Sequence, residues 1–153
     1  MVIADDAVEI RAQGWRTLAA LYGMIDGELE KALQAEHRIS VVEYTVLDAL
    51  SRQYGWHMRM AQLARAAALS GSATTRLVTR LEDRGLLMRV LCKDDRRGIY
   101  SELTEEGRAL LEAARPTHDG ILQAVLAEAA RMPELASLVG ALERHPSGAV
   151  AGQ

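Results

Sequence analysis

Residues 69–86, LSGSATTRLVTRLEDRGL, decide the fold that we predict from the sequence. Within this stretch, mostly apolar side chains recur at intervals of three and four, which is typical of the buried face of a helix. These side chains are Thr74, Leu77, Val78 and Leu81. The turn before them offers a serine as helix cap, and Gly85 follows at the point where a left-handed residue commonly ends a helix. We therefore predict a helix over residues 72–84.

The opposite face of this helix carries small, hydroxyl-bearing and basic side chains that suit DNA. They are Ser72, Ala73, Thr75, Arg76, Thr79 and Arg80. Short hydroxyl side chains and arginines can reach base edges when a helix lies in the ~12 Å wide major groove. Arg76 is the candidate for a bidentate guanine contact, and Ser70 and Arg80 are candidates for phosphate contacts. An ordinary amphipathic helix with a solvated face gives the same pattern, so this helix alone does not decide the function.

A predicted hairpin follows the helix and favours DNA binding. Two β-prone runs, residues 86–92 and 99–103, flank the polar connection KDDRRG at residues 93–98. With a short helix predicted over residues 60–67, the order is helix, turn, helix, hairpin. Arg96 and Arg97 at the tip of such a wing could enter the minor groove. Asp95 would orient Arg97 through a charge-assisted hydrogen bond, or form a surface ion pair worth under about 1 kcal/mol.

The charge distribution agrees with a DNA-binding middle region. Nine basic and four acidic residues lie between Arg59 and Arg97, a net charge of +5, whereas the remainder of the chain carries −8. A basic region between acidic arms indicates that one part of the chain meets a polyanion while the arms do other work. The overall charge of −3 conceals this asymmetry.

Long helices are predicted on both sides of this region. Apolar side chains at helical spacing run through residues 8–36, and a helix of that length would extend about 43 Å, which is longer than a small domain is wide. We therefore expect a partner subunit to cover it. Ser40 and Glu43 form a capping box for a helix over residues 41–53. A long helix is expected from Thr104 to about residue 130, bent or split at Pro116, and a last one from Pro133.

These residues together resemble the MarR family of bacterial transcriptional regulators. The matching blocks are Leu63-Ala64, residues 69–86, Asp95-Arg96-Arg97-Gly98 and residues 103–107. The resemblance implies a mainly α (α+β) fold that forms one single unit over residues 1–153. Residues 40–103 would form a winged helix-turn-helix with a two-stranded wing. Dimerisation helices at residues 8–36 and 104–145 would flank it. Thr74 departs from the valine common in the family, and Leu91-Cys92 replaces the usual Pro-Asp before the wing.

The resemblance also implies how the protein works. It predicts a homodimer that binds double-stranded DNA at a pseudo-palindromic operator, acts as a repressor and is released by a small phenolic or lipophilic effector or by an oxidant. The first residues lack the basic start and apolar stretch of a signal peptide, so a cytoplasmic protein is expected. Asp95 and Arg97 occupy the wing positions of the family, and Arg97 resembles its minor-groove arginine. The effector pocket of the family lies between the dimerisation helices and the winged region. Trp15, Tyr22 and Tyr44 are candidates to line it, although packing alone would account for their large rings.

Several other functions are disfavoured by the sequence. Cys92 is the only cysteine, so an internal disulfide is impossible, and a thiol in a half-buried strand is usually inert to oxidants. No two of the four histidines lie at the i, i+4 spacing of a zinc-binding helix, although a metal site shared between subunits stays open. No phosphate-binding loop, nucleophile elbow or carboxylate dyad indicates an enzyme or a cofactor, and no apolar run approaches the ~18 residues of a membrane helix. The alternative is a protein-interaction module that kept this fold without binding DNA specifically.

Overall fold

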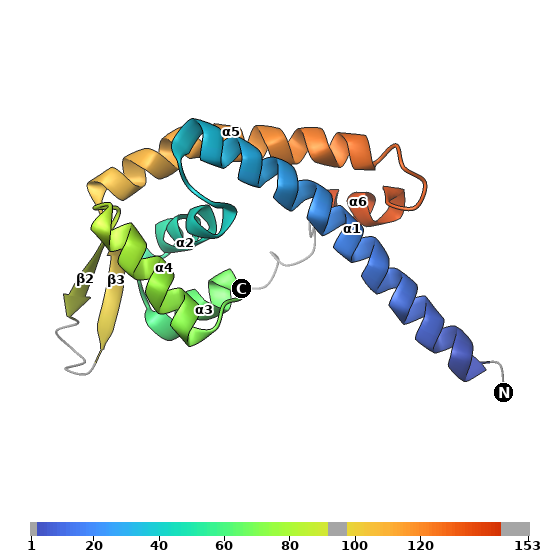
Figure 1. Cartoon of the computed structure of the whole chain (residues 1–153), viewed down its shortest axis with the longest axis horizontal. Coiled ribbons are helices and arrows are strands. Elements are labelled where there is room, and N and C mark those ends of the chain that lie inside the picture. The colour runs from blue at the N-terminus through green and yellow to red at the C-terminus, as the bar shows by residue number, and fades with distance from the viewer. Residues whose placement is uncertain (1–2, 92–97, 145–153) are drawn as a thin grey trace, which may run out of the picture. The chain divides into compact units, whose positions relative to one another are not determined.

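The structure is a computed structural model that describes residues 3–91 and 98–144 (Figure 1). Cys92, Asp95, Arg96 and Arg97, which the sequence analysis singled out, lie outside these described residues. Along the chain the elements are α1 (Ile3–His37), α2 (Val41–Ser51), the 3₁₀ turn η1 (Tyr54–Trp56), β1 (His57–Arg59), α3 (Met60–Ala67), α4 (Gly71–Asp83), β2 (Leu87–Leu91), β3 (Ile99–Leu103), α5 (Glu105–Ala129) and α6 (Ala136–Glu143).

The chain forms two compact units, which we describe separately. The winged unit comprises residues 30–118, and the helical unit comprises residues 1–29 and 119–153. Helices α1 and α5 each contribute one part to the winged unit and the other part to the helical unit.

The winged unit contains the predicted helix, turn, helix and hairpin. Helix α3 has the predicted bounds, and α4 begins and ends one residue earlier than predicted. Figure 1 shows α2, α3 and α4 gathered together, with the hairpin of β2 and β3 extending away from them. Helix α2 ends two residues before its predicted end, because the chain turns at η1 through positive φ angles at Gly55 (76°) and Trp56 (55°).

The predicted two-stranded wing hairpin is present, and a third strand, β1, joins it in a three-stranded antiparallel sheet. The strand order is β1-β3-β2, with Met58 opposite Ser101 and Arg89 opposite the same serine from the other side. The hairpin strands were predicted, whereas β1 was not. Because β1 has three residues, it is too short for an alternating pattern of period two to be visible in the sequence.

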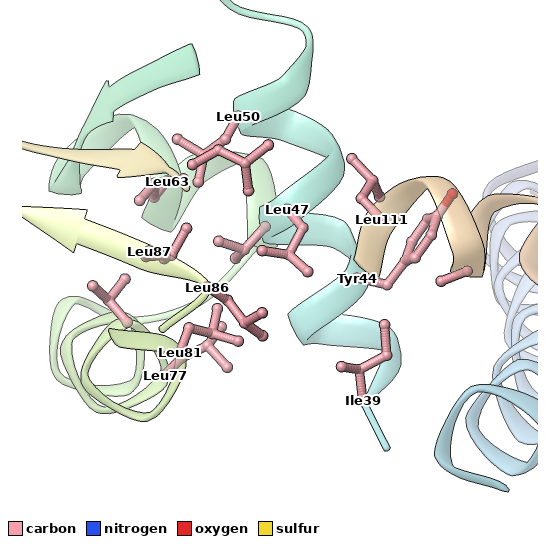
Figure 2. Close-up of a cluster of buried hydrophobic side chains, with 14 of the residues drawn as sticks. Ile39, Tyr44, Leu47, Leu50, Leu63, Leu77, Leu81, Leu86, Leu87 and Leu111 are labelled. Carbon is pink, nitrogen blue, oxygen red and sulfur yellow. The ribbon is translucent and has the colours of Figure 1, made fainter. Parts of the chain in front are cut away.

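One hydrophobic core holds the winged unit together (Figure 2). Leucines of α2, α3 and α4 meet leucines that follow α4, and Leu111 of α5 joins them. The side chains of Leu47, Leu50, Leu63 and Leu81 are fully buried. The four positions predicted to be the buried face of α4, namely Thr74, Leu77, Val78 and Leu81, are all buried, which confirms the helical register. The opposite face of α4 is therefore presented to solvent.

The helical unit has a smaller core of its own. Leu21 of α1 packs with Leu126 and Ala129 of α5, and Leu135 and Val139 close the cluster. Helix α1 is longer at both ends than predicted, and α6 begins at Ala136 rather than at Pro133.

Pro116 was predicted to bend or split the helix that follows the wing, and it does not split α5. A proline removes one helical donor, but the residues on either side of it are anchored within the winged unit. Ala114 is fully buried, and the Thr117 hydroxyl lies 2.8 Å from Nε2 of His37.

Candidate nucleic-acid interface

The N-terminal end of α4 is held by its capping serine. Ser70 is the N-cap, and its hydroxyl oxygen accepts a hydrogen bond from the backbone N–H of Ala73 at 3.2 Å. The hydroxyl of Thr74 donates to the carbonyl oxygen of Ser70 at 2.8 Å, so the one polar group on the buried face is satisfied. This bond explains how a threonine is accommodated at a buried position. The first turn of α4 is thus fixed by local contacts.

The C-terminal end of α4 is tied to three other elements. Gly85 ends the helix at φ 76°, as predicted, and the backbone N–H of Leu86 donates to Leu81 in a Schellman-type cap. Thr104, which precedes α5, donates its hydroxyl hydrogen to the Gly85 carbonyl at 2.7 Å. Arg84 donates to Glu43 of α2 at 3.2 Å. On the other side the Nε–H of Arg89 on β2 donates a bifurcated hydrogen bond to the two carboxylate oxygens of Glu82, at 2.8 and 3.1 Å.

The exposed face of α4 carries the predicted contact residues together. Ser72, Thr75, Arg76, Thr79 and Arg80 are exposed, and Ala73 is partly exposed. Arg76 and Arg80 also line a surface cavity of about 330 Å³ with Ser40 and Val42 at the start of α2. Ser70 is exposed at the head of the helix, where its hydroxyl lies 3.3 Å from that of Ser72.

Ion pairs separate the arginines of the winged unit into two kinds. Arg84 and Arg89 are neutralised by Glu43 and Glu82, and the hydrogen bond and charge of Glu82 raise the pKa of Arg89 above its ordinary value. By contrast, the side chains of Arg76 and Arg80 form no hydrogen bond or ion pair with any residue in the described part of the chain. Their positive charges are therefore available to a polyanion such as the DNA backbone.

The hydroxyl groups of the two exposed threonines are engaged within the helix. Thr75 donates to the carbonyl oxygen of Gly71 at 3.0 Å, and Thr79 donates to that of Thr75 at 2.9 Å. Sequence reasoning named both as contact residues but could not show how their hydroxyl hydrogens are used.

The base of the wing carries an ordered arginine that sequence reasoning counted only as charge. Nε of Arg59 donates to the Tyr100 hydroxyl at 3.0 Å, and the guanidinium carbon lies 5.3 Å from the centre of that ring. The two residues face each other across the β1–β3 pairing, and His57 meets the Tyr100 ring edge to face at 5.0 Å. Because β1 was not predicted, no local sequence signal could have linked residues 59 and 100.

The three aromatic residues predicted to line an effector pocket lie in different units. Tyr44 is buried in the winged core and stacks on His118, with ring centres 4.2 Å apart. Trp15 and Tyr22 are 67% and 65% exposed on α1 in the helical unit, where they line an apolar surface cavity of about 430 Å³ with Leu18 and Ala19.

Within residues 3–91 and 98–144, no group of three or more His, Cys, Asp or Glu side chains could hold a metal ion. In the same residues, no helix combines the length and apolar character needed to cross a lipid bilayer.

The geometry defines a winged helix-turn-helix protein: α3 and α4 form the helix-turn-helix, and β2 and β3 form the wing hairpin. A model of the MarR family matches residues 39–98, which cover most of this region.

Similarity to individual proteins extends over most of the chain. The HTH-type transcriptional regulator PecS of Dickeya dadantii (strain 3937) is 28% identical over 132 residues, which cover 84% of this chain and 79% of PecS. The crystal structure of AbsC, a MarR family transcriptional regulator from Streptomyces coelicolor, is 32% identical with a TM-score of 0.72, and the match covers 85% of this chain and 87% of AbsC. Sco3205 of the same organism, solved in complex with DNA, is 28% identical with a TM-score of 0.71 and coverages of 84% and 79%. The chain belongs to the MarR family.

Proposed function

We propose that this MarR family regulator acts as a homodimeric repressor, with α4 of each subunit in a major groove of a pseudo-palindromic operator and the wing at residues 93–98 in the adjacent minor groove. The observation that carries the proposal is the exposed face of α4, where Arg76 and Arg80 lack partners among the described residues while the neighbouring Arg84 and Arg89 are neutralised. The likeness to Sco3205, which was solved with DNA, supports the same orientation of the fold.

Each contact residue has a proposed role. Arg76 donates two hydrogen bonds to a guanine, and Ser72, Ala73, Thr75 and Thr79 contact neighbouring bases. Ser70 and Arg80, at the margins of the face, bind phosphates and set the register of the helix on the duplex. On the wing, Arg97 enters the minor groove with Arg96 beside it, and Asp95 orients Arg97.

The dimer follows from an apolar face of the helical unit. Trp15, Leu18 and Tyr22 of α1 are all exposed, and the cavity they line is almost without polar atoms. Val8, also exposed and seven residues before Trp15, extends the same face of the helix toward the N-terminus. Contiguous apolar surface of this kind is rare on a monomer and marks an interface. We assign residues 8–36 and 104–145 to dimerisation and residues 40–103 to DNA binding.

An effector pocket is proposed from the same aromatic residues. Trp15 and Tyr22 would contact a phenolic or lipophilic molecule with their exposed rings. Tyr44, which is buried in the winged core and stacked on His118, is the third candidate for this role. The protein is proposed to act in the cytoplasm as a regulator without catalytic activity.

The proposal is tested by salt-dependent binding of the wild type and single variants to an operator. Arg76→Ala should cost about 1–3 kcal/mol and relax base preference at one position of each half-site. Arg97→Ala should weaken binding to all sequences more evenly, and Arg80→Ala should reduce the slope of log K against log salt, because a phosphate contact releases counterions. Arg84→Ala is the matched control, since Glu43 already neutralises that guanidinium.

Unchanged affinity in both Arg76→Ala and Arg97→Ala at moderate salt would contradict the proposal. If the wild-type protein bound DNA without a steep salt dependence, the alternative of a protein-interaction module with this fold would be favoured instead.

A further inference from the structure

We infer that α4 reads A·T base pairs through the methyl groups of Thr75 and Thr79, beside the guanine read by Arg76. This inference rests on the proposed function and specifies the chemistry of the operator half-site. Its basis is the way in which the two exposed threonines use their hydroxyl hydrogens.

Both threonines are committed as donors before DNA arrives. A threonine hydroxyl has one hydrogen and two acceptor lone pairs. The Thr75 hydroxyl hydrogen is directed at the Gly71 carbonyl, with 3.0 Å between the oxygens, and the Thr79 hydroxyl hydrogen at the Thr75 carbonyl, with 2.9 Å. Each exposed side chain therefore offers DNA an acceptor and a methyl group. To donate to a base, either hydroxyl would first have to break a bond to its own helix.

The remaining members of the face supply donors at other places. The guanidinium of Arg76 has five N–H donors and no partner in the described residues. The Ser70 oxygen accepts from the Ala73 N–H and lies 3.3 Å from the Ser72 hydroxyl oxygen. One of the two hydroxyl hydrogens joins these oxygens, so the other can be donated to DNA at the N-terminus of the helix. Donors thus lie at Arg76 and at the helix N-terminus, whereas acceptors and methyl groups lie at Thr75 and Thr79.

An A·T pair matches the groups that the threonines offer. In the major groove it presents one amino donor, two acceptors and the C5 methyl group of thymine, which is apolar. A G·C pair also presents one amino donor and two acceptors but no methyl group, so the methyl group is the feature of an A·T pair that the threonine methyl groups can recognise. Thr75 and Thr79 are one helical turn apart, so they extend over successive base pairs. The half-site is therefore expected to combine a guanine with adjacent A·T pairs.

The first experiment uses the unmodified protein. Operator sites are selected by the full-length protein from random duplex DNA, and each thymine of the selected half-site is then replaced by uracil, which lacks only the C5 methyl group. Burial of one methyl group corresponds to about a fourfold change in affinity, or about 16-fold when both half-sites are altered. We expect at least one thymine per half-site at which uracil lowers affinity by this amount.

Two variants then identify the methyl group that contacts the thymine. Thr75→Val keeps the methyl and loses the hydroxyl, so we expect it to bind within about twofold of wild type and to remain sensitive to uracil. Thr75→Ser keeps the hydroxyl and loses the methyl, so it should bind the thymine operator about 16-fold more weakly and be insensitive to uracil at that position. The valine and serine substitutions of Thr79, measured on the thymine and uracil operators, provide an independent double-mutant cycle. Thermal melting of each variant checks that it is folded.

The outcomes separate the inference from the proposed function. If selection yields a site but no uracil substitution alters affinity, the inference is wrong while DNA binding stands. The same holds if the serine variants at positions 75 and 79 keep the preference for thymine over uracil and the valine variants lose it. If selection yields no preferred site and binding lacks a salt slope, the proposed function itself fails. Selection of G·C pairs throughout the positions beside the Arg76 guanine would likewise overturn the inference.

Discussion

Replacement of Gly107 by alanine should destabilise the winged unit, because no space exists for a β-carbon at this position. Gly107 lies in the first turn of α5, and its N–H donates to the capping hydroxyl of Thr104 at 3.0 Å. A β-carbon built on it would lie 2.2 Å from the carbonyl oxygen of Leu86 and 2.8 Å from Cδ1 of Leu103. The leucine methyl can rotate away, but the carbonyl belongs to backbone that is itself bonded to the Thr104 N–H at 3.1 Å.

The size of the effect follows from these contacts. The Leu86 carbonyl would have to move by roughly 1 Å to reach van der Waals distance, and overpacking of this kind costs about 1–3 kcal/mol. Weakening of the Thr104–Leu86 hydrogen bond adds about 1 kcal/mol, and the higher helix propensity of alanine offsets about 1 kcal/mol. The net loss of unfolding free energy should be about 1–3 kcal/mol, which lowers Tm by roughly 3–10 °C for a protein of this size.

The measurement is thermal unfolding by circular dichroism at one fixed protein concentration, because Tm of a dimer depends on concentration. Gly120→Ala is the matched control, since Gly120 lies in the same helix with no atom within 4 Å of a β-carbon. It should be neutral or stabilising by up to about 1 kcal/mol. If Gly107→Ala melted at or above the wild-type temperature, the close approach of α5 to Leu86 would be refuted.

Two further substitutions test the anchoring of α4. Ser70→Ala should cost about 0.5–2 kcal/mol of unfolding free energy, because the Ala73 N–H loses its cap acceptor. Ser72 caps no N–H, so Ser72→Ala should change the unfolding free energy by less than about 0.5 kcal/mol. Equal effects of the two substitutions in urea unfolding would contradict the assigned cap. Leu81→Ala should cost about 2–5 kcal/mol of unfolding free energy, because the Leu81 side chain is fully buried among α2, α4 and the hairpin. The Met88 side chain is 47% exposed, so Met88→Ala should cost far less in the same assay. A small effect at Leu81 would mean that this face of α4 is not the core face.

Local patterns in the sequence were sufficient for most of the winged unit. The spacing of Leu77, Val78 and Leu81 identified the buried face of α4, and the structure confirms each position. The capping box of Ser40 and Glu43 and the left-handed Gly85 were also predicted and are present. These features are visible because their cause lies within a few residues of chain.

What the sequence could not predict depends on residues that are distant along the chain. Strand β1 is held by pairing with β3 some forty residues later, and three residues carry no period of their own. Tyr44 was a candidate for an effector pocket because it is aromatic, but its stack on His118 of α5 became visible only in the folded winged unit. The hydrogen bonds from the Thr75 and Thr79 hydroxyls to the backbone are likewise visible only in the folded chain, because a threonine hydroxyl is equally able to donate outward.

The two ends of α4 are held in different ways, and this difference bears on regulation. Its C-terminal end is tied to α2 through Glu43, to β2 through Arg89 and to the start of α5 through Thr104. Its N-terminal end, which carries Ser72, Thr75 and Arg76, is held by its own cap and by the buried stripe below it. A displacement of α5 would therefore reach α4 at the end farther from the residues proposed to contact bases. Because α4 is continuous and its buried face is packed against the core, that displacement would move those residues as a rigid body. On this model an effector would release the operator by changing the position of the whole helix.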